Sequence, residues 1–142
     1  MLEKYVNLLW LIHYLGGRVD GRKKLQKLVY LSQQNGGPFQ ESFEYHPFGP
    51  FSEQLANELE EMKALGLVRE TRESTSFGCR YQYELTEAGQ ALIESSASSS
   101  LEPFKELVAE LGKYDARRLE LKATILFLVQ SDIPESELIT RI

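Results

Sequence analysis

The segment 81–92 constrains the fold more than any other part of the sequence, because it reads as a β-strand that runs directly into a capped helix. Tyr81, Tyr83 and Leu85 alternate with polar residues, which is the period of two expected for a half-buried strand. Thr86 follows at the N-cap position of the helix. The next residue is a glutamate, and the helix dipole favours a carboxylate there. The segment therefore predicts a strand that ends at the start of a helix.

The residues before this strand predict a partner for it. Segment 66–70 leaves a helix and enters a second strand, and segment 74–78 supplies polar and glycine residues for the turn between the two strands. A helix, a hairpin and a helix in this order are typical of winged-helix domains. We therefore predict an α+β fold, mostly α: a winged helix-turn-helix with a two-stranded wing and a C-terminal helical extension.

Apolar periodicity and capping residues predict the other elements. Helices are expected at 3–16, 22–34, about 53–65, 101–112 and 115–131, with a short terminal helix from Pro134. An aromatic connection at 35–51 contains a short strand at 43–46, which the Gly-Pro pair at 49–50 is expected to break. The chain then divides into a winged-helix domain (1–94), a serine-rich linker or loop (95–100) and a C-terminal helical extension (101–142), which packs on the domain or on a partner.

Composition bounds the class of protein. The 142 residues are 42% hydrophobic and include seven tyrosines, seven phenylalanines and one tryptophan, which is enough for one domain with a substantial core. No apolar run approaches the length of a membrane span, so we expect a cytoplasmic protein without membrane contact. Cys79 is the only cysteine, which excludes an internal disulfide and a cysteine-based zinc site.

No pattern of catalytic residues is present in the sequence. His13 lies inside an apolar helix and is interpreted as a core histidine, while His46 stands next to Pro47 without a cysteine or aspartate pattern around it. No phosphate-binding glycine loop or Gly-x-Ser-x-Gly elbow occurs. We therefore predict a protein that is not an enzyme and that holds no metal and no cofactor.

Charge gives a mixed indication about DNA. The net charge is −5, so any contact with DNA must come from a local patch. The candidates for contact with the DNA backbone are basic residues of the second helix and the wing: Arg22, Lys23, Lys24, Lys27, Arg69, Arg72 and Arg80. The third helix opposes groove insertion, because its wet face is expected to carry Glu53, Glu58, Glu60 and Glu61. The alternative is that the basic cluster is a solvated helix end or pairs with this acidic helix.

Surplus apolar residues favour a protein partner. The aromatic connection and the very apolar segments 3–16 and 121–131 exceed what a small winged helix needs for its own core. The candidates for a partner interface are Trp10, Phe43, Tyr45, Phe48, Phe51 and Phe127. A homodimer is the simplest use of both chain ends, and the alternative is that the extension folds back over the first helix within the monomer.

Three segments resemble a known family. Segments 21–31 (GRKKLQKLVYL), 43–52 (FEYHPFGPFS) and 117–125 (RRLELKATI) are similar to the YwgA family of bacterial proteins. A weaker similarity, confined to the KLQKL helix and the Gly-Pro segment, is to the SocA-like Panacea antitoxin domain. The resemblance implies a winged-helix-like fold and no settled activity.

Two functions follow as hypotheses. The first is a transcriptional regulator or antitoxin-like binder of double-stranded DNA, with a toxin as a conceivable protein partner. The second is an adaptor that has lost DNA affinity and binds proteins through the aromatic segment 39–51 and the terminal helices.

Overall fold

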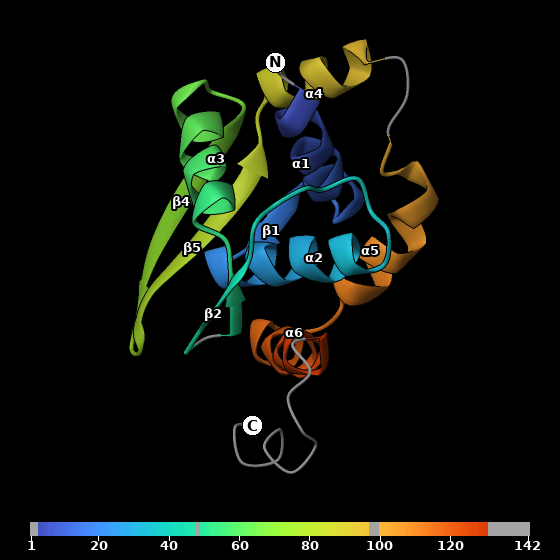
Figure 1. The fold of residues 1–142 in the computed structure, drawn as a ribbon. Coiled ribbons are helices and arrows are strands. Elements are labelled where there is room, and N and C mark those ends of the chain that lie inside the picture. The colour runs from blue at the N-terminus through green and yellow to red at the C-terminus, as the bar shows by residue number, and fades with distance from the viewer. Residues whose placement is uncertain (1–2, 48, 97–99, 131–142) are drawn as a thin grey trace.

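The computed structural model describes residues 3–47, 49–96 and 100–130, which form the mixed α/β fold predicted from the sequence (Figure 1). The elements in chain order are α1 (Glu3–Tyr14), β1 (Arg18–Asp20), α2 (Arg22–Gln34), β2 (Glu44–His46), β3 (Gly49–Phe51), α3 (Glu53–Ala64), β4 (Val68–Thr75), β5 (Gly78–Leu85), α4 (Glu87–Ser95), the 3-10 turn η1 (Glu102–Phe104), α5 (Lys105–Leu111) and α6 (Ala116–Gln130).

A three-stranded antiparallel sheet has the order β1-β5-β4. Tyr83 of β5 lies opposite Val19 of β1 on one side and opposite Glu70 of β4 on the other. The sequence was interpreted without β1, because a strand of three residues with one buried side chain shows no periodicity. The β4–β5 hairpin is also longer than predicted. Its outer half was missed because both of its faces are exposed, so apolar and polar residues do not alternate there.

A second hairpin joins β2 and β3, with Tyr45 opposite Pro50. Segment 43–46 was predicted as a lone strand, and the prediction that Gly49 and Pro50 break it was wrong: both lie in the partner strand. Proline is tolerated in such a short two-stranded pair, where it need not donate to a ladder on both sides. This hairpin packs against α2 and α6.

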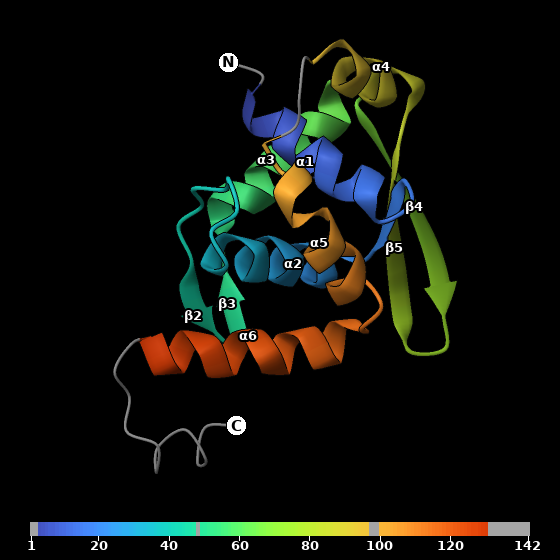
Figure 2. The same ribbon diagram turned by 90° about the vertical axis from the view of Figure 1, so that its right-hand side faces the viewer.

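Helix α2 lies at the centre of the molecule. Every residue in the segment 25–32 is buried, because helices and strands pack around several sides of this helix. It contacts β1, β3, α3, α5 and α6, and Figure 2 shows α6 running beside it with α5 across it. Over this segment α2 therefore has no single inner face.

The C-terminal helices complete the same core. Leu101, Val108, Leu119 and Ala123 belong to one buried cluster with the side chains of α1 to α4. In the described residues the extension thus packs on the domain of the same chain. The predicted helix from Pro134 and most of the serine linker, 97–99, lie outside the described residues.

Two polar residues lie where the sequence did not predict them. His13, expected in the core, is exposed and packs against the rings of Trp10 and Tyr14. Glu58, expected on the wet face of the third helix, is only 2% exposed. Neighbours on several sides of each helix decide which of its polar residues are covered.

None of the helices described here combines the length and the apolar character that crossing a membrane would require.

Candidate functional site

Two of the three segments that carry the family resemblance, 21–31 and 43–52, meet inside the molecule. The side-chain amide of Gln26 donates to the carbonyl oxygen of Ser52 at 2.8 Å, and its oxygen accepts from the backbone N–H of Ser52 at 2.9 Å. The ammonium of Lys27 donates to the carbonyl oxygen of Pro50 at 2.9 Å. The polar residues of the KLQKL helix therefore hold the Gly-Pro segment in place from within the core.

Lys27 is consequently not a surface cation. Its side chain is 1% exposed, and burial lowers its pKa from 10.5 to about 8, against the opposing effect of the Glu120 carboxylate. A phosphate of DNA cannot reach this ammonium without opening the core. Its assignment to a DNA-contacting patch was wrong. The position of a residue along a helix does not show which face of that helix a neighbouring element will cover.

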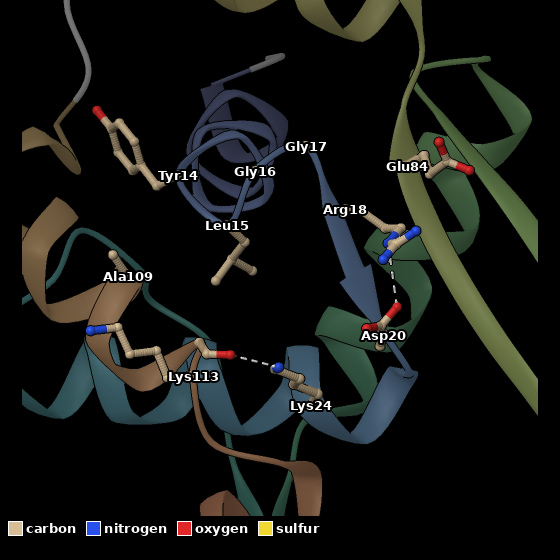
Figure 3. A pocket seen from close by; sticks show the side chains of 11 residues that line it. Tyr14, Leu15, Gly16, Gly17, Arg18, Asp20, Lys24, Glu84, Ala109 and Lys113 are labelled. Carbon is tan, nitrogen blue, oxygen red and sulfur yellow. Dashed lines mark hydrogen bonds and ion pairs between the residues drawn. The ribbon is translucent and has the colours of Figure 1, made fainter.

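Lys24 is also turned toward the protein. Its ammonium donates to the carbonyl oxygen of Gly112 at 2.7 Å, at the end of α5. It lines a pocket of about 520 Å³ between the end of α1, β1 and α5, where Arg18 pairs with Asp20 at 3.5 Å (Figure 3). The described lining combines acidic and basic side chains with backbone groups and includes no histidine, serine or cysteine.

Arg22 belongs to a polar network at the root of the β4–β5 hairpin. Its Nε donates to the hydroxyl of Tyr83 at 2.6 Å, and that hydroxyl donates to Glu70 at 2.6 Å. Lys63, at the end of α3, lies 3.2 Å from the other oxygen of Glu70. The network ties the start of α2 and the end of α3 to the hairpin.

The pKa values in this network follow from its contacts. Burial, with the hydrogen bond to Glu70, raises the pKa of Tyr83 well above its usual range. Partial burial opposes ionisation of Glu70, but hydrogen bonds from Tyr83, Lys63 and Arg22 outweigh it and lower the pKa of the carboxyl. The bond to Tyr83 raises the pKa of Arg22 in turn. The charged carboxylate and guanidinium are therefore the stable forms here.

The arginines of the hairpin divide between its two faces. Arg72 and Arg22 both lie over the ring of Tyr81, at 6.0 and 4.3 Å from its centroid, and Arg72 also donates to the sulfur of Cys79 at 3.3 Å. Arg69 and Arg80 lie on the other face, each opposite a glutamate of the neighbouring strand, and both are exposed. Lys23 is exposed in the first turn of α2. The structure therefore does not bring the seven basic candidates together on one surface.

The exposed face of α3 is acidic. Glu53, Glu60 and Glu61 are exposed, together with the neutral Gln54 and Asn57. The lysine of this helix, Lys63, pairs with Glu60 and Glu70 at 3.2 Å each, so its charge is already balanced.

Most aromatic candidates for a partner interface stabilise the domain itself. Trp10 stacks on Tyr14 and donates to the hydroxyl of Ser96; Phe43 and Phe127 pack against Tyr30. Phe51 is half-buried beside His46.

Two aromatic candidates remain. Tyr45 is 41% exposed and stacks on Phe127, and Phe48 lies outside the described residues. Other exposed apolar side chains were not named as candidates. Leu65 and Phe77 stand singly, whereas Leu121, Ile125 and Val129 lie together on α6, and their spacing of four residues was the signal that could have identified them.

Among residues 3–47, 49–96 and 100–130, no group of three or more histidine, cysteine, aspartate or glutamate side chains could hold a metal ion.

Comparison with known proteins gives one informative match. No protein-family model matches the chain. "Uncharacterized protein YwgA" of Bacillus subtilis (strain 168) is 36% identical over 111 residues, which are 78% of this chain and 66% of the relative. The matched part thus spans just under two thirds of that relative, whose name states no activity and no ligand.

Proposed function

We propose that this chain, which belongs to the YwgA family, is a winged-helix module that binds a protein partner and does not read DNA through its third helix. No catalytic role is proposed.

The order of elements supports the winged-helix assignment. A helix, a short strand, two helices and a long hairpin follow one another as α1, β1, α2, α3, β4 and β5, with β2 and β3 inserted before α3. The first strand pairs with the last, giving the order β1-β5-β4. In such modules the helix before the hairpin is the one that enters the major groove, and here that helix is α3.

The acidic face of α3 is the observation that carries the proposal. Glu53 and Glu60 would lie against phosphate groups, and each like-charge contact costs on the order of 1 kcal/mol near a protein surface. Glu60 is paired with Lys63, and the carboxylate of Glu61 accepts from the hydroxyl of Tyr5 at 2.7 Å, so Glu53 is the least compensated of the three. The same face suits a partner with a basic surface. Charge complementarity of this kind favours encounter with a protein partner and opposes encounter with DNA.

The basic residues of α2 support the same conclusion. Lys27 is buried, Lys24 is bound to Gly112, and Arg22 is bound to Tyr83 and Glu70. These cations stabilise the fold, and diverting them to phosphates would break hydrogen bonds that hold α2 to its neighbours.

A second candidate function is contact with the DNA backbone by the hairpin. It is favoured by the exposure of Arg69, Arg80 and Lys23, because exposed cations can position a protein on a duplex without reading its sequence. A regulator or antitoxin-like protein of this kind would bind DNA weakly and with strong salt dependence.

Fluorescence anisotropy on a mixed-sequence duplex distinguishes the two functions. We expect no binding by the wild type at either low or physiological salt, and a gain of salt-sensitive binding when Glu53→Lys is combined with Asn57→Lys, because both exposed positions then attract phosphate. The thermal unfolding midpoint of the variant serves as the folding control. Salt-sensitive binding by the wild type that is lost in the Lys23→Glu, Arg80→Glu variant would overturn the proposal in favour of the second candidate.

The protein partner is tested with the same α3 variant. Proteins that the wild type retains from a cell extract should be lost when the α3 face is reversed in charge. Retention that is identical for the wild type and the reversed variant would contradict a partner on this face.

A further inference from the structure

Helix α6 exposes an apolar stripe that the domain does not use. Leu121 is 47% exposed, Ile125 38% and Val129 51%, and their spacing of four residues places them on one face. The opposite face is buried through Leu119 and Ala123. Figure 2 shows α6 along the edge of the molecule, with α2 on its inner side.

We propose that this stripe binds the same stripe of a second copy, with the two α6 helices antiparallel and a two-fold axis at Ile125. The sequence of the stripe is symmetric about that residue, since Leu121 precedes it by four positions and Val129 follows it by four. In an antiparallel pair Leu121 then faces Val129 of the second copy, and Ile125 faces itself. This self-complementary arrangement is what a two-fold interface requires.

The charges on α6 select the antiparallel direction. Arg118 and Lys122 flank the apolar stripe near its start and are exposed, while no acidic residue lies in the first turn and no basic residue lies in the last. Antiparallel packing places these cations at opposite ends of the interface, away from those of the second copy. Parallel packing would place the four cations of the two copies together.

The β2–β3 hairpin lies beside the start of the stripe. Tyr45 stacks on Phe127 with ring centroids 6.0 Å apart and remains exposed. Tyr45 and Leu121 line a groove of about 690 Å³ between the hairpin and α6, and the rest of its lining is mostly charged or polar: Pro47, Asp115, Arg117, Arg118, Glu120 and Thr124. The apolar contact with the second copy is therefore made by α6 itself, with this polar groove at its margin.

Disulfide trapping tests the position of the axis. The exposed Cys79 is first replaced in a Cys79→Ser background, so that each added cysteine is the only one. Ile125→Cys should form a covalent dimer on mild oxidation, because a residue on the axis faces itself within the distance that a disulfide spans. Leu121→Cys is the matched control: its two copies lie roughly 12 Å apart along the helices and should not cross-link. An equal mixture of Leu121→Cys and Val129→Cys chains should give the mixed dimer.

Sedimentation of the full chain completes the test. The wild type should sediment at twice the monomer mass, and Ile125→Asp should sediment as a folded monomer with an unchanged circular dichroism spectrum. A monomeric wild type would overturn the inference, whether α6 is covered by another segment of the chain or by nothing. A dimer that cross-links through Leu121→Cys alone, or through none of the three positions, would overturn the proposed axis.

Discussion

At the scale of single residues, Lys27 shows how a charged side chain of a basic cluster becomes part of a core. Its ammonium reaches the Pro50 carbonyl, and Gln26 beside it binds both backbone groups of Ser52. A buried carbonyl left without a donor costs about 1 to 3 kcal/mol, so these side chains contribute to stability through the backbone that they satisfy. Their function is structural, which removes them from any nucleic-acid surface.

Lys27 predicts a pH dependence of stability. Its pKa is lowered to about 8 in the folded chain from 10.5, so the unfolded chain binds more protons between these values and stability rises with pH there. The cost of burying the charge is complete below about pH 8 and disappears above about pH 10.5. From pH 7 to pH 9.5 the free energy of unfolding of the wild type should rise by about 2 kcal/mol relative to Lys27→Met.

Urea denaturation of both proteins at the two pH values measures this difference. Other groups that titrate in the range, such as tyrosines, are common to both chains and cancel in the comparison. Parallel stability profiles for the wild type and Lys27→Met would show that the ammonium is not buried as described.

At the scale of elements, α6 depends on the close approach of strand β3. Gly49 has a φ of +87°, and a Cβ atom built on it would lie 2.6 Å from the hydroxyl oxygen of Thr124 on α6. The sequence indicates only a Gly-Pro break at this point. The structure shows that the missing side chain is what lets the hairpin and the helix touch.

Gly49→Ala should therefore destabilise the protein more than Gly66→Ala. Both glycines have positive φ values, +87° and +75°, so both alanines carry the strain of a left-handed backbone, about 1 to 2 kcal/mol. Only the first meets another element, because nothing lies within 4 Å of a Cβ at Gly66. The collision should add about 1 to 3 kcal/mol, measured as the difference in free energy of unfolding.

Thr124→Ala in the Gly49→Ala chain should recover part of the additional loss of stability, because it removes the hydroxyl oxygen that the added Cβ would meet. Equal destabilisation by the two glycine substitutions would mean that β3 does not rest on α6.

At the scale of the whole molecule, the winged-helix part and the C-terminal helices share one core. Val108 and Leu119 are fully buried in the same cluster as Leu8 and Leu28. Lys24 adds a hydrogen bond from α2 to the end of α5. A division of the chain near residue 96 therefore separates two parts of a single hydrophobic core.

A chain that ends at Ser96 should not unfold cooperatively. It leaves the buried faces of α1 and α2 exposed to water, and each large apolar side chain that is exposed costs about 1.5 to 3 kcal/mol. Differential scanning calorimetry should show no sharp transition, and adding the separate segment 97–142 should restore one. A sharp transition in the shortened chain alone would show that residues 1–96 fold independently.

Local signals in the sequence determined those elements whose formation depends on neighbours along the chain. The strand that runs into α4 was predicted from its alternation and from Thr86, whose hydroxyl accepts from the N–H of Gly89 at 3.1 Å. Ser52 caps α3 in the same way, with its hydroxyl accepting from Leu55. Capping and periodicity act over three or four residues, so the sequence alone displays them.

Tertiary structure alone decided which polar groups face water. Lys27 and Glu58 belong to polar stretches of amphipathic helices and are buried, whereas His13 belongs to an apolar stretch and is exposed. Strand β1 exists because β5 offers it backbone partners from more than sixty residues away along the chain. Burial and strand pairing depend on the elements that the fold brings together. The sequence of one helix or strand does not specify which other elements will pack against it.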